Sequence, residues 1–150
     1  MTSGVKAYID EVPGSLVPCV GAVVTDAAGR YLLVRRGREP ARGLWSVPGG
    51  RVEAGESDPE ATVREVREET GLDVEVLGLV GYVERPGLGG ATYAINDYRC
   101  RLAPGTDPAG ARAGDDADDV GWFAEDELRA LPTTPGLVEA LEDWGVLGRG

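Results

Sequence analysis

The chain has 150 residues, which predicts a single domain over 1–150 with a core of its own and a loose lead-in at residues 1–15. Its formal net charge of -11 disfavours a nucleic-acid backbone or an anionic membrane as partner, because both require a clustered basic surface. The chain contains no histidine, which excludes Ser-His and Cys-His catalysis and leaves carboxylates and metal-bound water as the chemical groups.

Two observations predict a cytoplasmic protein without disulfides. Residues 1–12 lack the basic start and apolar core of a signal peptide, and the longest apolar run, residues 16–24, is too short to span a bilayer. The two cysteines, Cys19 and Cys100, lie in strand-like surroundings. We therefore expect them to be small buried hydrophobic residues rather than a disulfide.

The N-terminal part of the chain predicts a hairpin followed by an arginine-rich loop. Residues 16–25 and 30–36 have the composition of strands, and a turn containing Asp and Gly separates them. The loop sequence RRGREPARG then leads to the glycine-rich segment VPGG at residues 47–50. Arginines in such a loop are either solvated or hold substrate phosphates by bidentate hydrogen bonds, and Arg35 and Arg42 are our candidates for the second role.

A helix with marked ends is predicted at residues 57–70. Ser57 and Glu60 form a capping-box pattern, and Pro59 lies in the first turn, where its missing N–H costs least. Gly71 can adopt the left-handed conformation that commonly ends a helix. The capping signals therefore fix both ends of this element.

One side of this helix is predicted to pack, whereas the opposite side holds three carboxylates within an arc of about 100°. They belong to Glu65, Glu68 and Glu69. Such a face is either solvated surface, with Arg64 and Glu68 paired four residues apart, or a metal site. The loop before the helix adds Glu56, and oxygen ligands alone favour a hard ion such as Mg2+ or Mn2+.

The stretch GRVEAGESDPEATVREVREETGL at residues 50–72 resembles the Nudix box, with the pattern G-x5-E-x7-R-E-U-x-E-E-x-G-U. Every fixed position is filled, by Gly50, Glu56, Arg64, Glu65, Val66, Glu68, Glu69, Gly71 and Leu72. The segments GLWSVPGG and DDVGWFAEDELRAL on either side also resemble Nudix sequences. This resemblance implies an α/β fold, a Nudix-type α/β/α sandwich with a mixed sheet and a central box helix.

The resemblance also implies Mg2+-dependent or Mn2+-dependent hydrolysis of a diphosphate linkage in a small-molecule nucleotide. It implies four metal ligands: the carbonyl of Gly49 and the side chains of Glu65, Glu68 and Glu69. Glu65 or Glu56 would accept the proton of the attacking water. Arg64 would orient a neighbouring glutamate. A homodimer stays compatible with the sequence.

The second half of the chain predicts a long hairpin, a loop and two short helices. Residues 73–85 and 91–102 have strand composition around a turn at residues 86–90. Tyr82 and Tyr93 in these strands are either ordinary strand residues or surfaces for the substrate. The acidic loop at residues 104–119 contributes Asp115 and Asp116 as further candidate ligands of metal or substrate. A strand at residues 120–123 and helices at residues 125–131 and 135–144 complete the prediction.

The flanks of the box resemble the compact ADP-ribose pyrophosphatase subgroup. We therefore expect ADP-ribose to be hydrolysed to AMP and ribose 5-phosphate. A proline beyond the box that marks ADP-ribose enzymes is only approximated by Pro86. The alternatives are a nucleoside triphosphate pyrophosphatase that clears modified nucleotides and a nucleotide-binding regulator without catalysis, although the intact glutamates argue against the regulator.

Overall fold

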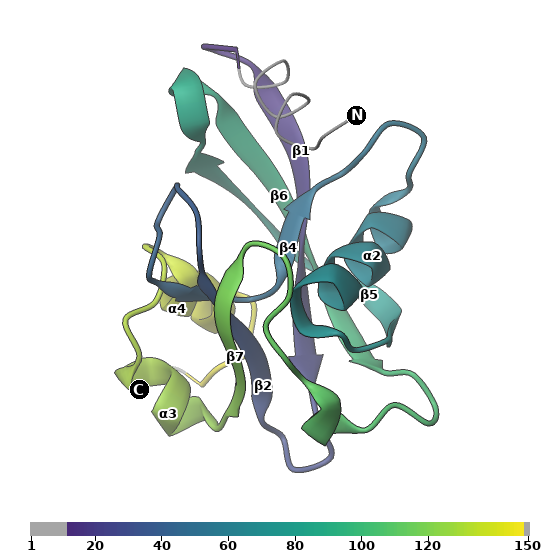
Figure 1. Cartoon of the computed structure of the whole chain (residues 1–150). Coiled ribbons are helices and arrows are strands. Elements are labelled where there is room, and N and C mark those ends of the chain that lie inside the picture. The colour runs from purple at the N-terminus through teal and green to yellow at the C-terminus, as the bar shows by residue number, and fades with distance from the viewer. Residues whose placement is uncertain (1–11, 149–150) are drawn as a thin grey trace.

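A seven-stranded mixed sheet forms the centre of the protein, in a computed structural model that describes residues 12–148 (Figure 1). The strands are β1 (Leu16–Thr25), β2 (Tyr31–Arg36), β3 (Trp45–Ser46), β4 (Gly49–Arg51), β5 (Val74–Pro86), β6 (Thr92–Leu102) and β7 (Ala117–Phe123). The helices are α2 (Asp58–Thr70), α3 (Glu125–Ala130) and α4 (Leu137–Asp143), with 3-10 turns η1 (Leu88–Gly90) and η2 (Pro108–Gly110). The strand order is β3-β2-β1-β6-β5, while β4 pairs with β1 and β7 pairs with β2.

Two hydrophobic clusters on opposite faces of the sheet produce the three-layer arrangement. Ala22 and Val24 of β1 belong to a cluster with Val66 of α2, whereas Val23 belongs to a cluster with Leu128 of α3 and residues of α4. Because successive side chains of a strand point to opposite faces, β1 separates α2 from α3 and α4. This is the α/β/α sandwich that the sequence predicts (Figure 1).

The hairpin β5–β6 is confirmed, but β1 and β2 pair much less than a regular hairpin would. Their recorded register is limited to Thr25 opposite Tyr31. Over its whole length, β1 instead pairs in parallel with β6, and β4 pairs with its middle. Sequence patterns identify strands well, but long-range partners such as β6 compete for the same backbone groups.

Only residues 12–15 of the predicted lead-in are described. Residues 1–11 of the predicted lead-in lie outside the described residues, while the amide of Gly14 donates to the carbonyl of Gly90 at 3.2 Å. Both cysteines are buried and free, and burial raises the pKa of each thiol to about 12. No helix between residues 12 and 148 is long and apolar enough to cross a membrane.

Candidate active site

The helix α2 begins and ends as its capping signals predict. The hydroxyl of Ser57 accepts a hydrogen bond from the amide of Glu60 at 3.2 Å, and the carboxylate of Glu60 accepts one from the amide of Ser57 at 2.9 Å. Gly71 ends the helix with a φ of 74°, which favours glycine. Asp58 accepts hydrogen bonds from Asn96 and Tyr98 of β6, each at 3.0 Å, so the helix start is tied to the sheet.

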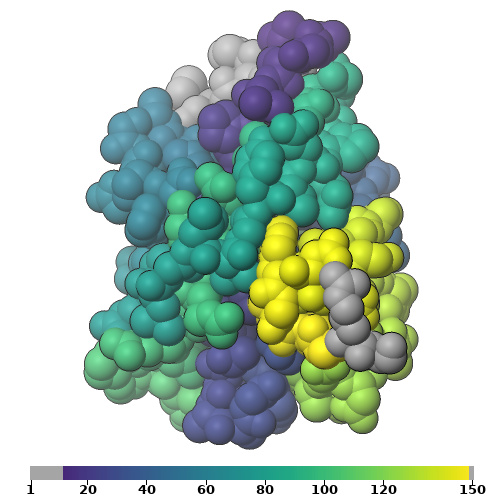
Figure 2. All heavy atoms as spheres, turned by 180° about the vertical axis from the view of Figure 1, so that it is seen from behind, coloured from purple at the N-terminus to yellow at the C-terminus, as the bar shows by residue number. Residues whose placement is uncertain are grey.

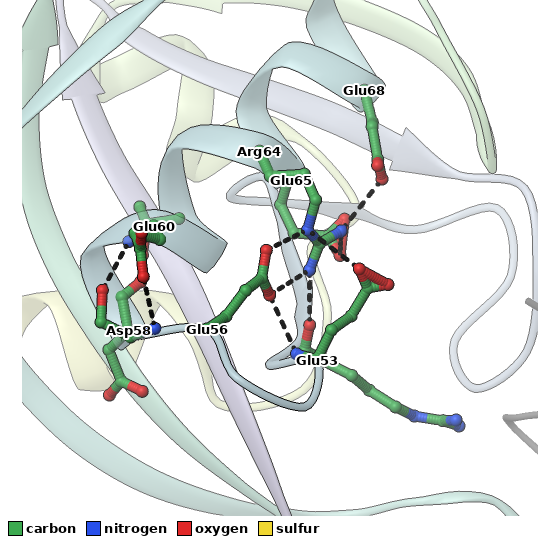
Figure 3. A network of polar contacts seen from close by, with 10 residues as sticks. Glu53, Glu56, Asp58, Glu60, Arg64, Glu65 and Glu68 are labelled. Atoms are coloured by element: carbon green, nitrogen blue, oxygen red, sulfur yellow. Dashed lines mark hydrogen bonds and ion pairs between the residues drawn. The ribbon is translucent and has the colours of Figure 1, made fainter.

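Arg64 lies at the centre of the carboxylates of the box (Figure 3). Its guanidinium donates to both oxygens of Glu56, at 2.6 and 2.9 Å, and to the carbonyl of Arg51 at 2.9 Å. It also contacts Glu65 and Glu68, each at 3.2 Å. The hydrogen bonds with Glu56 raise the pKa of Arg64, so this residue stays charged and holds the carboxylates together.

Glu65 and Glu69 form a carboxylate pair next to the glycine-rich segment at residues 47–50, and only 13% of the Glu65 side chain is exposed. Glu69 is only 9% exposed, and its carboxylate accepts a hydrogen bond from the amide of Gly49 at 3.4 Å. Burial, followed by the charge of Glu65, raises the pKa of Glu69 well above its usual range. Burial also raises the pKa of Glu65, although Arg64 partly opposes this effect. Any Cβ at Gly50 would lie 2.3 Å from a Glu65 oxygen, so the backbone must approach this pair closely.

The donor chemistry of this pair fits a hard divalent cation. Two adjacent carboxylates in a poorly solvated position repel each other, and a cation would remove both the repulsion and the need for protonation. Glu68 is more exposed, at 44% of its side chain, and is paired with Arg64. Between residues 12 and 148, the side chains do not form a preassembled metal cage of three acidic, histidine or cysteine groups. Glu68 would therefore have to turn away from Arg64 to join a cation at Glu65 and Glu69.

The acidic loop reaches the same helix through its backbone. The amides of Arg112, Gly114 and Asp115 donate to the carbonyls of Thr70, Glu69 and Glu68, at 3.0, 2.9 and 3.1 Å. The backbone of Asp115 therefore lies beside the turn that carries Glu68 and Glu69, and its role as a ligand stays a prediction. Asp116 instead forms an exposed ion pair with Arg38 at 2.7 Å.

The remaining substrate candidates do not converge on one surface. Tyr82 pairs with Asn96 across the β5–β6 ladder and so lies on the α2 face, where it is 47% exposed. Tyr93 lies on the opposite face of β6, and its hydroxyl accepts a hydrogen bond from Arg51 at 3.3 Å. Tyr82 and Tyr93 therefore lie on opposite faces of the β5–β6 hairpin, and their roles toward substrate stay predictions.

The two arginine candidates lie on neighbouring segments with different surroundings. Arg42 lies in the loop after β2, where its guanidinium donates to the carbonyl of Gly37 at 3.2 Å. Arg35 lies within β2, between its strand partners Trp45 and Asp119. Arg42 is therefore held by a hydrogen bond to the backbone of its own loop, whereas Arg35 is held in place by the pairing of its strand.

Asp97 was missed by the sequence analysis. It lies in the middle of β6 and is only 4% exposed, and its Oδ1 has no hydrogen-bond partner within residues 12–148. Burial, partly opposed by the charge of Arg85, raises the pKa of Asp97 to about 7. The one available signal was an aspartate inside a strand pattern, a residue type that strands disfavour.

Comparison with known proteins defines the class to which this fold and this carboxylate helix belong. The NUDIX domain family matches residues 15–144, so the chain belongs to the Nudix hydrolase family. The structure is similar to that of a MutT NUDIX hydrolase from Burkholderia pseudomallei, with a TM-score of 0.73 and 31% identity over 85% of this chain and 97% of that one.

Two curated relatives carry different substrate names. An ADP-ribose pyrophosphatase from Methanocaldococcus jannaschii is 34% identical over 109 residues, which are 73% of this chain and 61% of that protein. A putative 8-oxo-dGTP diphosphatase from Bacillus subtilis is 44% identical over 64 residues, 43% of this chain and 41% of that protein. The chain therefore spans less than two thirds of the length of either relative.

Proposed function

We propose that this protein hydrolyses the diphosphate linkage of a nucleoside diphosphate derivative, and that the derivative is ADP-ribose. The observation that carries the proposal is the adjacent pair of Glu65 and Glu69, whose pKa values are raised by burial and, for Glu69, by the charge of Glu65, although Arg64 partly opposes the shift of Glu65. A divalent cation at this pair would supply positive charge, and the anionic diphosphate of the substrate would bind to that cation. Membership of the Nudix family supports the same reaction class.

The residues around the pair divide the remaining tasks. Glu65, Glu68, Glu69 and the backbone of Gly49 would hold Mg2+ or Mn2+, which when bound neutralises charge on the diphosphate and acidifies water. Glu56 already accepts hydrogen bonds from Arg64 and from the amide of Glu53. Both of its oxygens are therefore engaged, whereas Glu65 makes a single and longer contact with Arg64, at 3.2 Å, so Glu65 is the better acceptor for the proton of the attacking water. Arg64 keeps these glutamates in place and is a positioning residue.

ADP-ribose is favoured as the substrate by one relative and opposed by another. The M. jannaschii protein matches over the longer segment and is named an ADP-ribose pyrophosphatase, which supports release of AMP and ribose 5-phosphate. The B. subtilis protein supports a second candidate, hydrolysis of an oxidised nucleoside triphosphate. A cytoplasmic location and a homodimer stay predictions from the sequence.

A side-by-side assay of the two substrate classes tests the proposal. We expect ADP-ribose to be hydrolysed to AMP and ribose 5-phosphate, identified by chromatography, with a kcat/KM above that for pyrophosphate release from common or oxidised triphosphates. A triphosphate preference of about tenfold, or about 1.4 kcal/mol in transition-state binding, would favour the second candidate. Absence of turnover with every diphosphate would contradict the reaction class itself.

A further inference from the structure

The surroundings of Asp97 are shaped by glycines on both neighbouring strands. Its register partners are Gly21 in β1 and Gly81 in β5. A Cβ at Gly21 would lie 2.0 Å from the Asp97 carboxylate, and one at Gly81 would lie 2.0 Å from the Trp144 ring. The Asp97 carboxylate therefore occupies the position over Gly21, next to Val47, and the Trp144 ring occupies the position over Gly81.

An acid in this position is poorly explained by packing. A buried polar atom without a partner costs about 1–3 kcal/mol, and an apolar residue of similar volume would avoid that cost. The nearby cation does not satisfy it, because the guanidinium of Arg85 donates to the carbonyls of Glu84 and Gly136, at 3.3 and 3.2 Å. A hydrogen-bond partner for Oδ1 must come from outside the described residues.

Asp97 is close to the candidate active site although it faces away from α2. Gly21 is paired on one side with Gly49 of β4 and on the other side with Asp97 of β6. Adjacent strands lie about 4.8 Å apart, so the backbones of Gly49 and Asp97 are about 10 Å apart. A nucleotide whose diphosphate lies beside Gly49 could therefore extend its nucleoside or its terminal sugar toward Asp97.

The face around Asp97 continues as a partly open surface. Ile95 and Tyr93 follow on the same face of β6, both half-buried, and the Arg51 guanidinium lies 5.7 Å from the centre of the Tyr93 ring. The C-terminal helix contacts β5 at two levels, because Trp144 lies over Gly81 and the carbonyl of Gly136 accepts a hydrogen bond from Arg85 at 3.2 Å. Figure 2 shows this C-terminal segment beside the strands of the β5–β6 hairpin, whose upper part extends beyond it.

We propose that Asp97 is a specificity-determining residue that hydrogen-bonds an uncharged polar group of the substrate between Val47 and Trp144. The group is an amine, a ring N–H or a hydroxyl, because the Asp97 carboxylate would repel a phosphate but can accept a hydrogen bond from each of these groups. The inference rests on the proposed function, since it uses the same substrate and places the diphosphate at Gly49. No sequence motif marks Asp97, because its surroundings are formed by strands that are distant in the sequence.

The test measures kcat and KM for the wild type, Asp97→Asn and Asp97→Ala with ADP-ribose and with three analogues. One analogue has hypoxanthine in place of adenine, one lacks the 2′-hydroxyl of the adenosine, and one is the methyl ester of ADP, which lacks the terminal sugar. Asp73→Asn is the matched control, because its carboxylate forms an exposed ion pair with Arg67 at the far end of α2.

We expect KM for ADP-ribose to rise about tenfold in Asp97→Ala and less in Asp97→Asn, with kcat nearly unchanged. In the wild type, KM for one of the analogues should exceed KM for ADP-ribose by a similar factor. In Asp97→Ala, KM for that analogue and KM for ADP-ribose should be equal. That analogue identifies whether the base, the nucleoside ribose or the terminal sugar is bound.

Two results would overturn the inference. If the losses from Asp97→Ala and from every analogue simply multiply, Asp97 has only a structural role. If the wild type hydrolyses none of the diphosphates, the proposed function is wrong and the inference falls with it. The two failures are therefore distinguished by the wild-type rate alone. Circular dichroism and melting temperatures of both variants confirm that the comparison is made between folded proteins.

Discussion

The acids on the two faces of the sheet are in opposite electrostatic situations. On the α2 face, Glu56 and Glu68 are paired with Arg64, whose guanidinium sits among several carboxylates. On the other face, Oδ1 of Asp97 has no hydrogen-bond partner among residues 12–148, and burial, partly opposed by Arg85, raises the pKa of Asp97 to about 7. Glu65 is intermediate, because burial raises its pKa although Arg64 lies 3.2 Å away and partly opposes the effect.

Glu69 lies between these two extremes. It is as buried as a core residue, yet within residues 12–148 the backbone donates to it only through the amide of Gly49, and Glu65 adds a second negative charge. The α2 face is thus compensated at its rim by Arg64 and left uncompensated at its centre. A bound cation would complete it, whereas the Asp97 face needs an uncharged donor.

Removal of divalent cations should cause the largest loss of turnover. It should act through the carboxylates on the α2 face and not through Asp97 on the other face. Excess chelator is expected to abolish turnover, while added Mg2+ or Mn2+ restores it. The melting temperature should change little, because the core clusters of the sheet contain no metal ligand. Full activity in chelator would show that the carboxylates of α2 are not a metal site.

Replacing Glu69 by Gln should lower turnover by about 100-fold or more, because a ligand charge is lost while volume is kept. In chelator, the same variant should be as stable as the wild type or about 1 kcal/mol more stable, since a buried and repelled carboxylate has been removed. Glu75→Gln is the control, because Glu75 forms only an exposed ion pair with Arg101. Near-normal turnover at limiting Mg2+ would remove Glu69 from the metal site.

Asp97→Asn should change how stability depends on pH. An unfolded aspartate has a pKa near 3.8 and the folded one about 7, so the folded wild type binds the extra proton between these values. Relative to Asp97→Asn, the wild type is most stable below pH 3.8 and loses about 2–4 kcal/mol as the pH rises through 7.

Urea unfolding of both proteins across this range, in chelator, measures the difference. Asp73→Asn, which alters an exposed ion pair, should leave the pH dependence unchanged. Parallel curves for the wild type and Asp97→Asn would mean that Asp97 is solvated or paired in the folded protein.

Arg64→Lys tests whether the rim of the α2 face depends on the guanidinium shape. An ammonium group cannot donate to both oxygens of Glu56 and to the carbonyl of Arg51 at once. We expect a loss of about 1–3 kcal/mol in the free energy of unfolding, with a smaller loss of turnover than in Glu69→Gln. Thermal unfolding of Arg67→Lys, an exposed ion pair in the same helix, provides the control.

The two faces also differ in how far the sequence predicts them. Ser57, Glu60 and Gly71 act within one helix, so local capping signals predicted its ends, and the box pattern predicted which glutamates share a side. The isolation of Asp97 depends on Gly21 and Gly81, which are distant in sequence and become neighbours only through the sheet register. Likewise, no local signal showed that Tyr82 and Tyr93 face opposite sides, because that required the pairing of β5 with β6.

The smallest loss of turnover is expected from a substitution in the loop that contacts the last turn of α2. Gly114 lies so near the helix that a Cβ would be 1.9 Å from the carbonyl oxygen of Glu68. Gly114→Ala must therefore push the loop away and weaken the hydrogen bonds that the amides of Gly114 and Asp115 donate to the last turn. The loss should be about 1–2 kcal/mol in stability, with turnover reduced a few-fold because the turn carrying Glu68 and Glu69 loosens.

Gly78→Ala is the matched control for this last change. A Cβ at Gly78 would meet no atom within 4 Å, and its backbone needs no left-handed conformation. Its melting temperature should stay the same or rise slightly, because alanine restricts the unfolded chain more than glycine does. Equal stability of Gly114→Ala and Gly78→Ala would show that the loop does not clamp α2, and the placement of Asp115 beside the carboxylates would lose its support.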